Sequence, residues 1–427
     1  MALLVAKFGG TSVASPERIQ MVAKRLVGIK QAGDDVVAVV SAMGKTTDEL
    51  VGLAAAVSKN PPKREMDRLL STGEQVSMTL LAMAIDALGY RAMSFTGRQA
   101  GIQTDTEHSR AKIQLVHADR IKAAIDAGII PVVAGFQGID ANGDITTLGR
   151  GGSDTTAVAV AYGIGADRCE IFSDVDGVYT ADPRVAPRAH KLDQIDYDDM
   201  LELASSGAGV LQSRAVEFAR KYNVVIHSRS AFTQTPGTLI QEVDPSMEQA
   251  VITGIAHDTS EVKLTIRDVP DTSGVAARVF SSLAGNSVNV DMIIQNISED
   301  GLTDITFTCP EADLERAEAV LPSLIAKVGA RDYVVDTNIA KVSIVGTGMK
   351  STPGVSAKAF QALADNDVNI LLISTSPIRL SVVVAADQVD LAVRALHTAF
   401  DLDSDTIFEE TMLSAEEIEA KKQKGRS

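Results

Sequence analysis

The chain has 427 residues, a length greater than one compact core usually contains, and 45% of the residues are hydrophobic. We therefore expect two or three domains. Its formal net charge of −16, with no run of Lys or Arg long enough for a basic arm, argues against nucleic-acid and anionic-lipid partners. No apolar run reaches the ~18 residues of a membrane-spanning helix, and the two cysteines lie far apart in apolar surroundings, so a soluble cytoplasmic protein without disulfides is predicted.

Short β-branched runs alternate with helix-period segments from the start of the chain to about Phe232. The first helical segment begins at Ser15-Pro16-Glu17, which supplies an N-cap, a proline at the first helical position and an early acid. The clearest predicted strands are Leu3–Lys7, Val36–Ser41, Ile129–Phe136, Glu170–Ser173 and Val224–His227. This alternation predicts an α/β domain with a largely parallel sheet.

The first predicted strand ends in Lys7 and is followed by Gly9, Gly10 and Ser12. Ligands of open α/β sheets bind at the carboxyl edge of the strands, and glycines let backbone N–H groups approach phosphate oxygens. Lys7 would then meet a phosphoryl group. A lysine at a strand end before a plain Gly-Gly turn explains the segment equally well, because the spacing matches neither the Walker A motif nor the dinucleotide fingerprint.

Two polar clusters follow along the chain. Ser41 and Thr47 lie after the second predicted strand and could donate hydrogen bonds to a carboxylate. Glu74, in the run Ser-Thr-Gly-Glu before a predicted helix, could pair with an ammonium group. Helix capping explains both clusters as well, and it is the slightly favoured explanation for each cluster alone.

A glycine-rich loop, Gly-Arg-Gly-Gly-Ser-Asp, occupies residues 149–154 before a helical pattern. Three glycines in four positions and Ser153 as N-cap form an anion cradle, beside which Arg150 and Asp154 add a cation and an acid. The combination favours a binding site over a plain glycine turn.

The segment 173–184, Ser-Asp-Val-Asp-Gly-Val-Tyr-Thr-Ala-Asp-Pro-Arg, starts where an apolar strand ends. Asp-Gly and Asp-Pro are ordinary turn dipeptides, so a well-ordered turn explains it. A tyrosine, several acids and an arginine at the carboxyl edge of a strand could equally hold the base, ribose and phosphates of a nucleotide, and the segment alone leaves both interpretations open.

Turn-forming residues after Phe232 place a domain boundary there, with a first domain over 1–240 and a linker over 241–260. Beyond the linker the chain repeats itself at an offset of 80 residues, and the recurring positions include Gly274 with Gly354 and Asn289 with Asn369. Each copy is predicted as a small βαββα(β) module, over 261–335 and 336–410. The predicted strands are Val262–Ile266, Val290–Ile294 and Ile305–Cys309 in the first copy and Val342–Val345, Ile370–Ile373 and Leu380–Val384 in the second. Residues 411–427 are expected to form a solvated tail.

Together these motifs resemble the aspartate kinase family, within the amino-acid kinase fold, and the C-terminal duplication resembles a pair of ACT domains. The resemblance rests on Lys-Phe-Gly-Gly-Thr-Ser-Val at 7–13, Ser-Thr-Gly-Glu at 71–74, the glycine loop, the segment 173–184 and the tandem repeat. It implies a mostly parallel sheet sandwiched by helices, followed by two βαββαβ modules. It also implies ATP-dependent phosphorylation of the aspartate β-carboxylate to 4-phospho-aspartate, with Mg²⁺, as the first step of lysine, threonine and methionine synthesis.

The resemblance and the chemistry assign roles to the motif residues. An aspartate side chain is ionised at neutral pH, so no general base is needed and catalysis should consist of positioning and charge neutralisation. Lys7 would meet the transferring phosphoryl group, with Asp154 orienting it or the metal-bound phosphates. Glu74 would pair with the substrate ammonium and Arg150 with its α-carboxylate. The other expected contacts are Ser41, Thr47, Gly151, Gly152 and Ser153 for the substrate, and Gly9, Gly10, Ser12, Ser173, Asp174, Tyr179, Asp182 and Arg184 for ATP. The metal ligands are not assigned.

One position departs from the family pattern. The family usually has a lysine that approaches the nucleotide in a Gly-x-Lys-Val-Leu segment, whereas this chain has Gly209 there. Arg214 or Lys221 could substitute. A rival hypothesis is an amino-acid sensor that keeps the kinase fold without turnover, and a third is a kinase of another amino-acid carboxylate.

The repeats suggest regulation. A glycine that opens a helix, and an asparagine before the next strand, could clasp the carboxylate and ammonium of an amino acid. The expected effector residues are Asp271, Gly274, Asn289, Gln295 and Asn369, and the resemblance makes threonine, alone or with lysine, the effector. Gln295 is placed just past the strand Val290–Ile294. We expect a homo-oligomer, or an α2β2 assembly with a regulatory subunit that starts internally near Met247.

Overall fold

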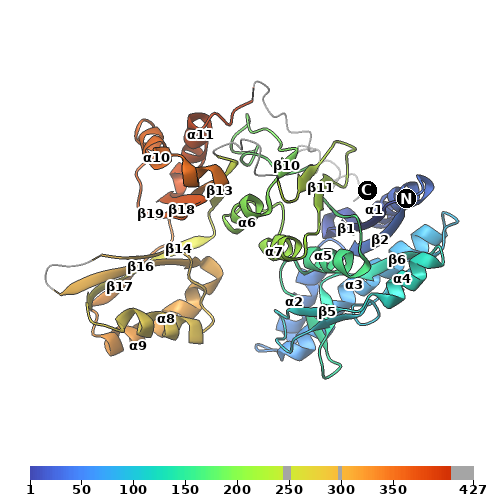
Figure 1. Cartoon of the computed structure of the whole chain (residues 1–427). Helices are drawn as coiled ribbons and strands as arrows, with labels where there is room; N and C mark the ends of the chain where they lie inside the picture. The colour runs from blue at the N-terminus through green and yellow to red at the C-terminus, as the bar shows by residue number, and fades with distance from the viewer. Residues whose placement is uncertain (244–251, 297–300, 405–427) are drawn as a thin grey trace, which may run out of the picture. The chain divides into compact units, whose positions relative to one another are not determined.

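The computed structural model describes residues 1–243, 252–296 and 301–404 (Figure 1). Its described residues form two compact units. The first holds residues 1–179, 191–205 and 209–243, and the second holds 180–190, 206–208 and the described residues from 252 onward. Met247 and the tail 411–427 lie outside the described residues. No helix in the described ranges combines the length and the apolar character that crossing a membrane requires.

The first unit contains an eight-stranded sheet and a four-stranded sheet. The strands are β1 (Leu3–Phe8), β2 (Asp35–Val40), β3 (Ala92–Phe95), β4 (Ile102–Thr104), β5 (Ile113–Val116), β6 (Ile130–Ala134), β7 (Gln137–Ile139), β8 (Ile145–Thr147), β9 (Arg168–Ser173), β10 (Gln194–Ile195), β11 (Ile226–Ser230) and β12 (Thr238–Ile240). The helices are α1 (Pro16–Gln31), α2 (Thr46–Val57), α3 (Lys63–Asp86), α4 (Asp119–Asp126), α5 (Gly152–Ile164), α6 (Tyr197–Ser205) and α7 (Ser213–Tyr222), with a 3-10 turn over Gly10–Val13.

The large sheet has the strand order β10-β12-β11-β9-β1-β2-β6-β3, and β11, β9, β1, β2, β6 and β3 pair in parallel. The prediction of an α/β fold with a largely parallel sheet is confirmed, and the five strands predicted from the sequence match strands that differ from them by a few residues at their ends. Because the central strands are parallel, the segments that follow β1, β2, β6, β9 and β11 all leave the sheet at one edge.

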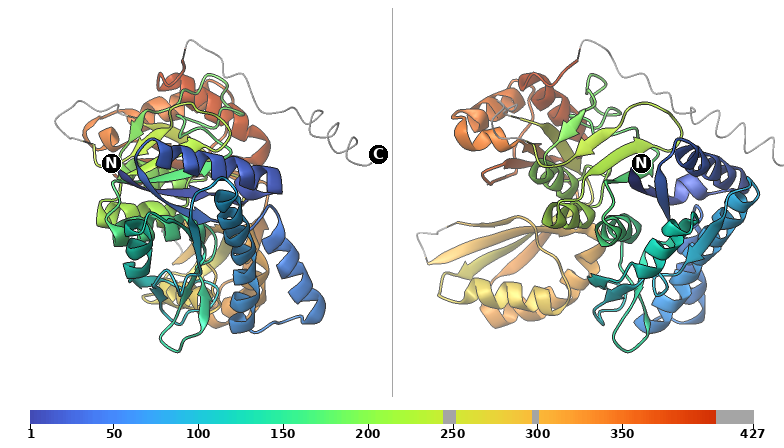
Figure 2. Two further views of the ribbon diagram at one scale, coloured as in Figure 1. Left: turned by 90° about the vertical axis from the view of Figure 1, so that its right-hand side faces the viewer. Right: turned by 45° about the vertical axis from the view of Figure 1, so that its right-hand side comes forward.

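Helices cover both faces of this sheet (Figure 2). Side chains that alternate along β1, among them Leu4 and Phe8, join a buried apolar cluster with α1 and α3. Successive side chains of a strand point to opposite faces, so Lys7 lies on the other face, where α5 packs against β1 and β9. The strand period therefore directs the one lysine of β1 toward the start of α5.

The second unit contains two modules of the same design, and the predicted repeat is confirmed. Their strands are β13 (Gly254–Asp258), β14 (Glu261–Pro270), β15 (Ile293–Gln295), β16 (Leu302–Pro310), β17 (Asp332–Asp336), β18 (Ile339–Val345), β19 (Leu372–Thr375) and β20 (Arg379–Ala385). The helices are α8 (Val275–Gly285), α9 (Leu314–Val328), α10 (Val355–Ala364) and α11 (Val389–Ala399). Even the backbone repeats, since Gly274 and Gly354 precede their helices with φ of 88° and 90°.

Three details of the second unit differ from the expectations. The segment expected to be a linker contains β13, which pairs with β18 and is the edge strand of the second module, in the place that β17 takes in the first. The strand predicted over Val290–Ile294 is β15, which begins later, so Gln295 is its last residue. Residues 180–190, expected within the first domain, belong to the second unit, where Thr180 accepts a hydrogen bond from the backbone of Ile255.

Candidate active site

The carboxyl edge of the large sheet brings Lys7 and Asp154 together. Lys7 ends up on the α5 face of β1, and Asp154 lies in the first turn of α5. The ammonium nitrogen and the carboxylate oxygen Oδ1 are 2.5 Å apart, and both residues are more than 90% buried. A buried ion pair is costly to desolvate and contributes little net stability, so its presence at a sheet edge points to a chemical role for the pair.

The segment after β1 forms a tight turn beside this pair. Gly9 donates its N–H to the carbonyl of Phe172, and Ser12 donates its N–H to the carbonyl of Gly9. A Cβ on Gly10 would lie 3.0 Å from the carbonyl oxygen of Ala42, so the position has little space for a side chain. The hydroxyl of Ser12 is buried and has no hydrogen-bond partner among the described residues, as expected of a group that awaits a ligand.

The glycine loop differs in one respect from the prediction. Helix α5 begins at Gly152 and is preceded by Gly151, so Ser153 lies inside the first turn and is not the N-cap. Gly151 has a φ of 66°, and a Cβ there would lie 1.9 Å from Cγ of Gln212. Both the left-handed backbone and the lack of space require glycine. Arg150 is exposed beside this helix start.

Glu74 lies in the middle of α3, not before a helix, so capping does not explain it. Its Oε1 accepts a hydrogen bond from the N–H of Ala42 at 3.1 Å, whereas its Oε2 is buried without a hydrogen-bond partner among the described residues. Gly73 lets the helix approach, because a Cβ there would lie 2.8 Å from Cβ of Ala42. Burial raises the pKa of the Glu74 carboxyl to about 7. An unpaired buried carboxylate oxygen suits a ligand cation.

Ser41 and Thr47 lie on either side of the turn between β2 and α2. The carbonyl of Ser41 accepts a hydrogen bond from the hydroxyl of Ser77, one turn beyond Glu74 on α3. Thr47 belongs to the first turn of α2, where it is half-buried. The sequence did not single out Ser77, because an isolated serine inside a helix carries no motif.

The segment 173–184 is divided between the two units. Ser173 and Tyr179 belong to the first, as does Asp174, which is exposed, while Asp182 and Arg184 belong to the second and form an ion pair of 2.7 Å with each other.

Within the first unit the segment is held by partners distant in sequence. The hydroxyl of Tyr179 donates to Asp176 at 2.9 Å, and Lys191 bonds to Asp176 at 3.1 Å and to the carbonyl of Pro236 at 2.6 Å. Burial, together with the Asp176 carboxylate, raises the pKa of Tyr179, which keeps the phenol protonated. The sequence did not predict the pairing of Lys191 with Asp176, because the two residues are 15 positions apart and no local pattern indicates their contact.

Gly209 is exposed, and a Cβ built there would meet no atom within 4 Å. Of the two proposed substitutes for the family lysine, Arg214 is held by other partners, whereas Lys221 is exposed. Arg214 donates to the carbonyl oxygens of Leu148 and Ala111, at 2.7 Å each, and the ammonium of Lys221 lies 5.1 Å from the ring centre of Tyr222. Position 209 itself therefore has open space for a longer side chain.

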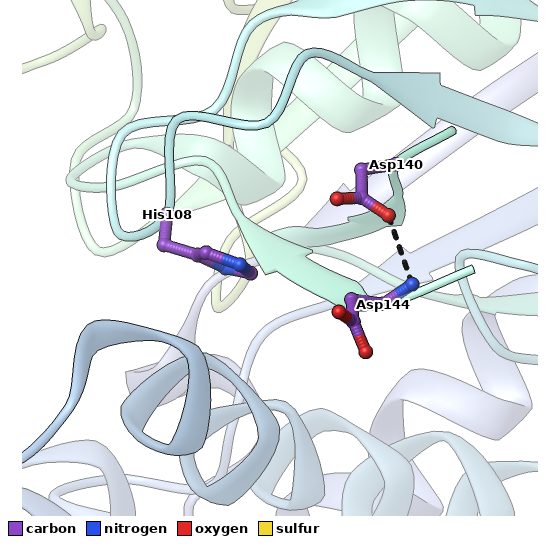
Figure 3. A group of neighbouring side chains, drawn as sticks. All are labelled: His108, Asp140 and Asp144. Carbon is purple, nitrogen blue, oxygen red and sulfur yellow. Dashed lines mark hydrogen bonds between the residues drawn. The ribbon is translucent and has the colours of Figure 1, made fainter. Parts of the chain in front are cut away.

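One group of side chains in the described residues has the composition of a metal site. His108, Asp140 and Asp144 each offer one atom within 4.8 Å of the others, at the hairpin of β7 and β8 (Figure 3). Asp144 forms an ion pair of 2.5 Å with Arg64, and His108 bonds to Asp67 through Nδ1 at 2.8 Å. Asp144 and His108 therefore already have partners within the protein.

The second unit holds a pocket of about 500 Å³ in its second module. Its lining includes Gly354, Ser356, Thr375 and Ser376, at the start of α10 and the end of β19, and Asn369 is not among the lining residues. In the first module Asp271, which is exposed, precedes α8 and Gly274 opens it, and Gln295 ends β15. The N–H of Asn289 donates to Asp313 at 2.9 Å.

Comparison with known proteins agrees with this architecture. The model of the amino acid kinase family matches residues 2–230, and an ACT domain model matches 267–323 and 342–400. Aspartokinase of Pseudomonas aeruginosa is 53% identical over 406 residues, which cover 95% of this chain and 98% of that protein. The structure of E. coli aspartokinase III with aspartate and ADP is 24% identical, with a TM-score of 0.79 over 93% of this chain and 99% of that one. The same enzyme with lysine and aspartate has a TM-score of 0.73 at 25% identity, over the same shares.

Proposed function

Since the chain belongs to the amino acid kinase family and is an aspartate kinase, we propose that it transfers the γ-phosphoryl group of ATP to the β-carboxylate of aspartate and forms 4-phospho-aspartate. The observation that carries the proposal is the buried pair of Lys7 and Asp154 between two glycine-rich turns. The attacking carboxylate is already ionised at neutral pH, so the site needs cations and N–H donors and no base.

Lys7 neutralises charge on the transferring phosphoryl group, and Asp154 holds the ammonium of Lys7 in position. Gly9 and Gly10 lack side chains, so phosphate oxygens can approach the backbone there, and they bind the N–H of Gly10 and the unpartnered hydroxyl of Ser12. These groups fit a polyphosphate, for which Mg²⁺ would supply further neutralisation of charge. In the first unit, Ser173, Asp174 and Tyr179 are the proposed nucleotide contacts. Asp182 and Arg184, in the second unit, stay predictions.

Aspartate is recognised by groups of both signs. The free Oε2 of Glu74 binds its ammonium, and the guanidinium of Arg150 binds its α-carboxylate through two parallel hydrogen bonds. Gly151, Gly152 and Ser153 present N–H groups at the start of α5, while Ser41 and Thr47 face the β-carboxylate. Aspartate and ADP in the related E. coli structure support this choice of substrates.

We further propose that the tandem modules sense threonine, lysine or both, and that the product feeds the synthesis of lysine, threonine and methionine. Lysine in the second E. coli structure supports an amino-acid effector. The pocket at Gly354 and the matching segment of the first module, with Asp271, Gly274, Asn289 and Gln295, are the proposed sites. Asn369 stays a prediction, as do the cytoplasmic location and an oligomer, either of one subunit type or α2β2 with a subunit that starts near Met247.

A coupled assay of ADP release tests the proposal. Wild-type protein with Mg-ATP should release ADP when aspartate is added and not when glutamate or N-acetylglutamate replaces it. Aspartate-dependent release together with the acyl phosphate product supports the proposal. No release with any amino acid would favour the sensor without turnover, and release with another carboxylate would change the substrate.

A further inference from the structure

Asp67 lies on the buried face of α3, and its side chain is completely shielded from solvent. Its two oxygens accept hydrogen bonds from three groups outside the helix: the N–H of Ser109 at 3.0 Å, Nδ1 of His108 at 2.8 Å and the hydroxyl of Thr147 at 2.6 Å. A buried carboxylate is tolerated only when it is well hydrogen-bonded. Asp67 therefore links helix α3 to two other segments of the chain, one at residues 108–109 and one at Thr147.

The segments that Asp67 joins lead directly to the glycine loop. Thr147 is the last residue of β8, two positions before Gly149, and its carbonyl accepts the N–H of Ala111 at 2.9 Å. Ser109 has a φ of 72°, a left-handed conformation that L-residues rarely adopt, and a Cβ on Gly149 would lie 3.2 Å from the Ser109 carbonyl oxygen. The segment 108–111 therefore packs closely against the loop that carries Arg150.

Helix α3 connects this network to the other half of the substrate site. Asp67 and Glu74 are seven positions apart, two helical turns, and both lie on the buried face. One rigid element therefore carries the proposed partner of the substrate ammonium and the carboxylate that holds the loop for the α-carboxylate.

The neighbouring group of His108, Asp140 and Asp144 belongs to the same scaffold (Figure 3). One oxygen of Asp140 accepts the N–H groups of Asn142 and Asp144, at 2.9 Å each, so it shapes the turn between β7 and β8. Asp140 acts at the far end of the hairpin from Thr147. It offers a matched control for Asp67, because both are buried carboxylates that brace β8.

We propose that Asp67 is a positioning residue for substrate binding, which holds Arg150 at the distance from Glu74 that aspartate requires. The proposal rests on the proposed function, in which Arg150 binds the α-carboxylate. Asp67 touches no substrate and acts through Ser109, Thr147 and the glycine loop.

The test compares steady-state kinetics of Asp67→Asn with those of Asp140→Asn. An amide at position 67 cannot accept all the hydrogen bonds of the carboxylate, so the loop should shift and the KM for aspartate should rise roughly 10- to 100-fold. The KM for ATP should change less than threefold, as a rough bound. Asp140→Asn should lower Tm without raising the KM for aspartate. If Asp67→Asn does not fold, Thr147→Val, which removes one hydrogen bond at nearly constant shape, replaces it.

A double-mutant cycle with Arg150→Ala separates positioning from general stability. If Asp67 acts through Arg150, the change at 67 should have little further effect on the KM for aspartate once Arg150 is gone. Two results would overturn the proposal and leave the proposed function intact. One is additive effects of the two changes on the KM for aspartate. The other is an unchanged KM for aspartate in a folded variant at position 67 or 147, while Arg150→Ala raises it. An unchanged KM for aspartate in Arg150→Ala itself would overturn this proposal and the assignment of Arg150 to the α-carboxylate.

Discussion

Glu74 has a buried carboxylate with one oxygen bonded to the backbone and one without a partner, and burial raises its pKa to about 7. Only the ionised form attracts the ammonium of aspartate, so protons compete with the substrate near neutrality. In the complex the substrate cation lowers this pKa again. The residue therefore couples aspartate binding to pH.

We predict that kcat/KM for aspartate rises with pH between roughly 6 and 8, as Glu74 loses its proton in the free enzyme. In Glu74→Gln this rise should disappear, and the KM for aspartate should be raised about 10- to 150-fold, the worth of a hydrogen bond to a charged group. Initial rates over this pH range, with the KM for ATP as internal control, provide the check. An identical pH profile in both proteins would refute the role of Glu74.

Gly209 stands where the family resemblance leads us to expect a lysine. A Cβ there would meet open space, and the residue has no positive φ that would demand glycine. Gly209→Lys should lower the KM for ATP about 2- to 5-fold, the range expected for one exposed ion pair. Gly209→Met, of similar length without charge, is the control. A KM for ATP that stays unchanged or rises in the lysine variant would show that the loop lies away from the nucleotide.

At the scale of elements, α5 begins where Gly151 allows Gln212 to pack against the backbone. Gly151→Ala should displace the helix start with Asp154 and lower kcat/KM by about 10²-fold. Gly143→Ala is the control, because its φ of 85° is similarly unfavourable for alanine but nothing lies within 4 Å. Equal loss of activity in both variants at equal Tm would mean that backbone strain, not the collision, is responsible.

Local patterns predicted the elements that depend on local residues. Alternating strands and helices, the glycines after β1 and the glycine loop before α5 all lie where their sequence neighbourhood indicates. The sequence could not reveal that Glu74 lies inside α3, because Ser-Thr-Gly-Glu is also typical of a helix start. Nor could it reveal Asp67, whose partners Ser109 and Thr147 lie 42 and 80 residues away.

At the scale of the whole molecule, the repeat predicted two modules but not the strand that forms the edge of the second one. The edge strand of the second module, β13, comes from before the first, so its pairing with β18 depends on residues nearly 90 positions apart and leaves no local signal. The internal symmetry also makes Gln295 and Thr375 equivalent, 80 positions apart, and Thr375 lines the pocket of the second module.

Gln295→Ala should shift threonine inhibition to higher concentration, by about 5- to 150-fold, and leave kcat without effector nearly unchanged. An effector inhibits only if it binds two conformations differently, so removing one contact reduces that difference. Thr375→Ala is the partner variant, and inhibition curves for threonine, lysine and their mixture assign each module. Wild-type activity that ignores both amino acids would make the modules a platform for association.

The central claim is that the buried ammonium of Lys7 neutralises the transferring phosphoryl group. Its most direct test is kcat of Lys7→Ala, measured by ADP release at saturating aspartate and Mg-ATP. Loss of one preorganised cation should lower kcat about 10²- to 10³-fold, with little change in the KM for aspartate. Lys30 pairs with Asp35 at the amino end of β2, away from the carboxyl edge of the sheet, so Lys30→Ala should keep kcat near the wild-type value. A kcat of Lys7→Ala close to that of the wild type would contradict the account.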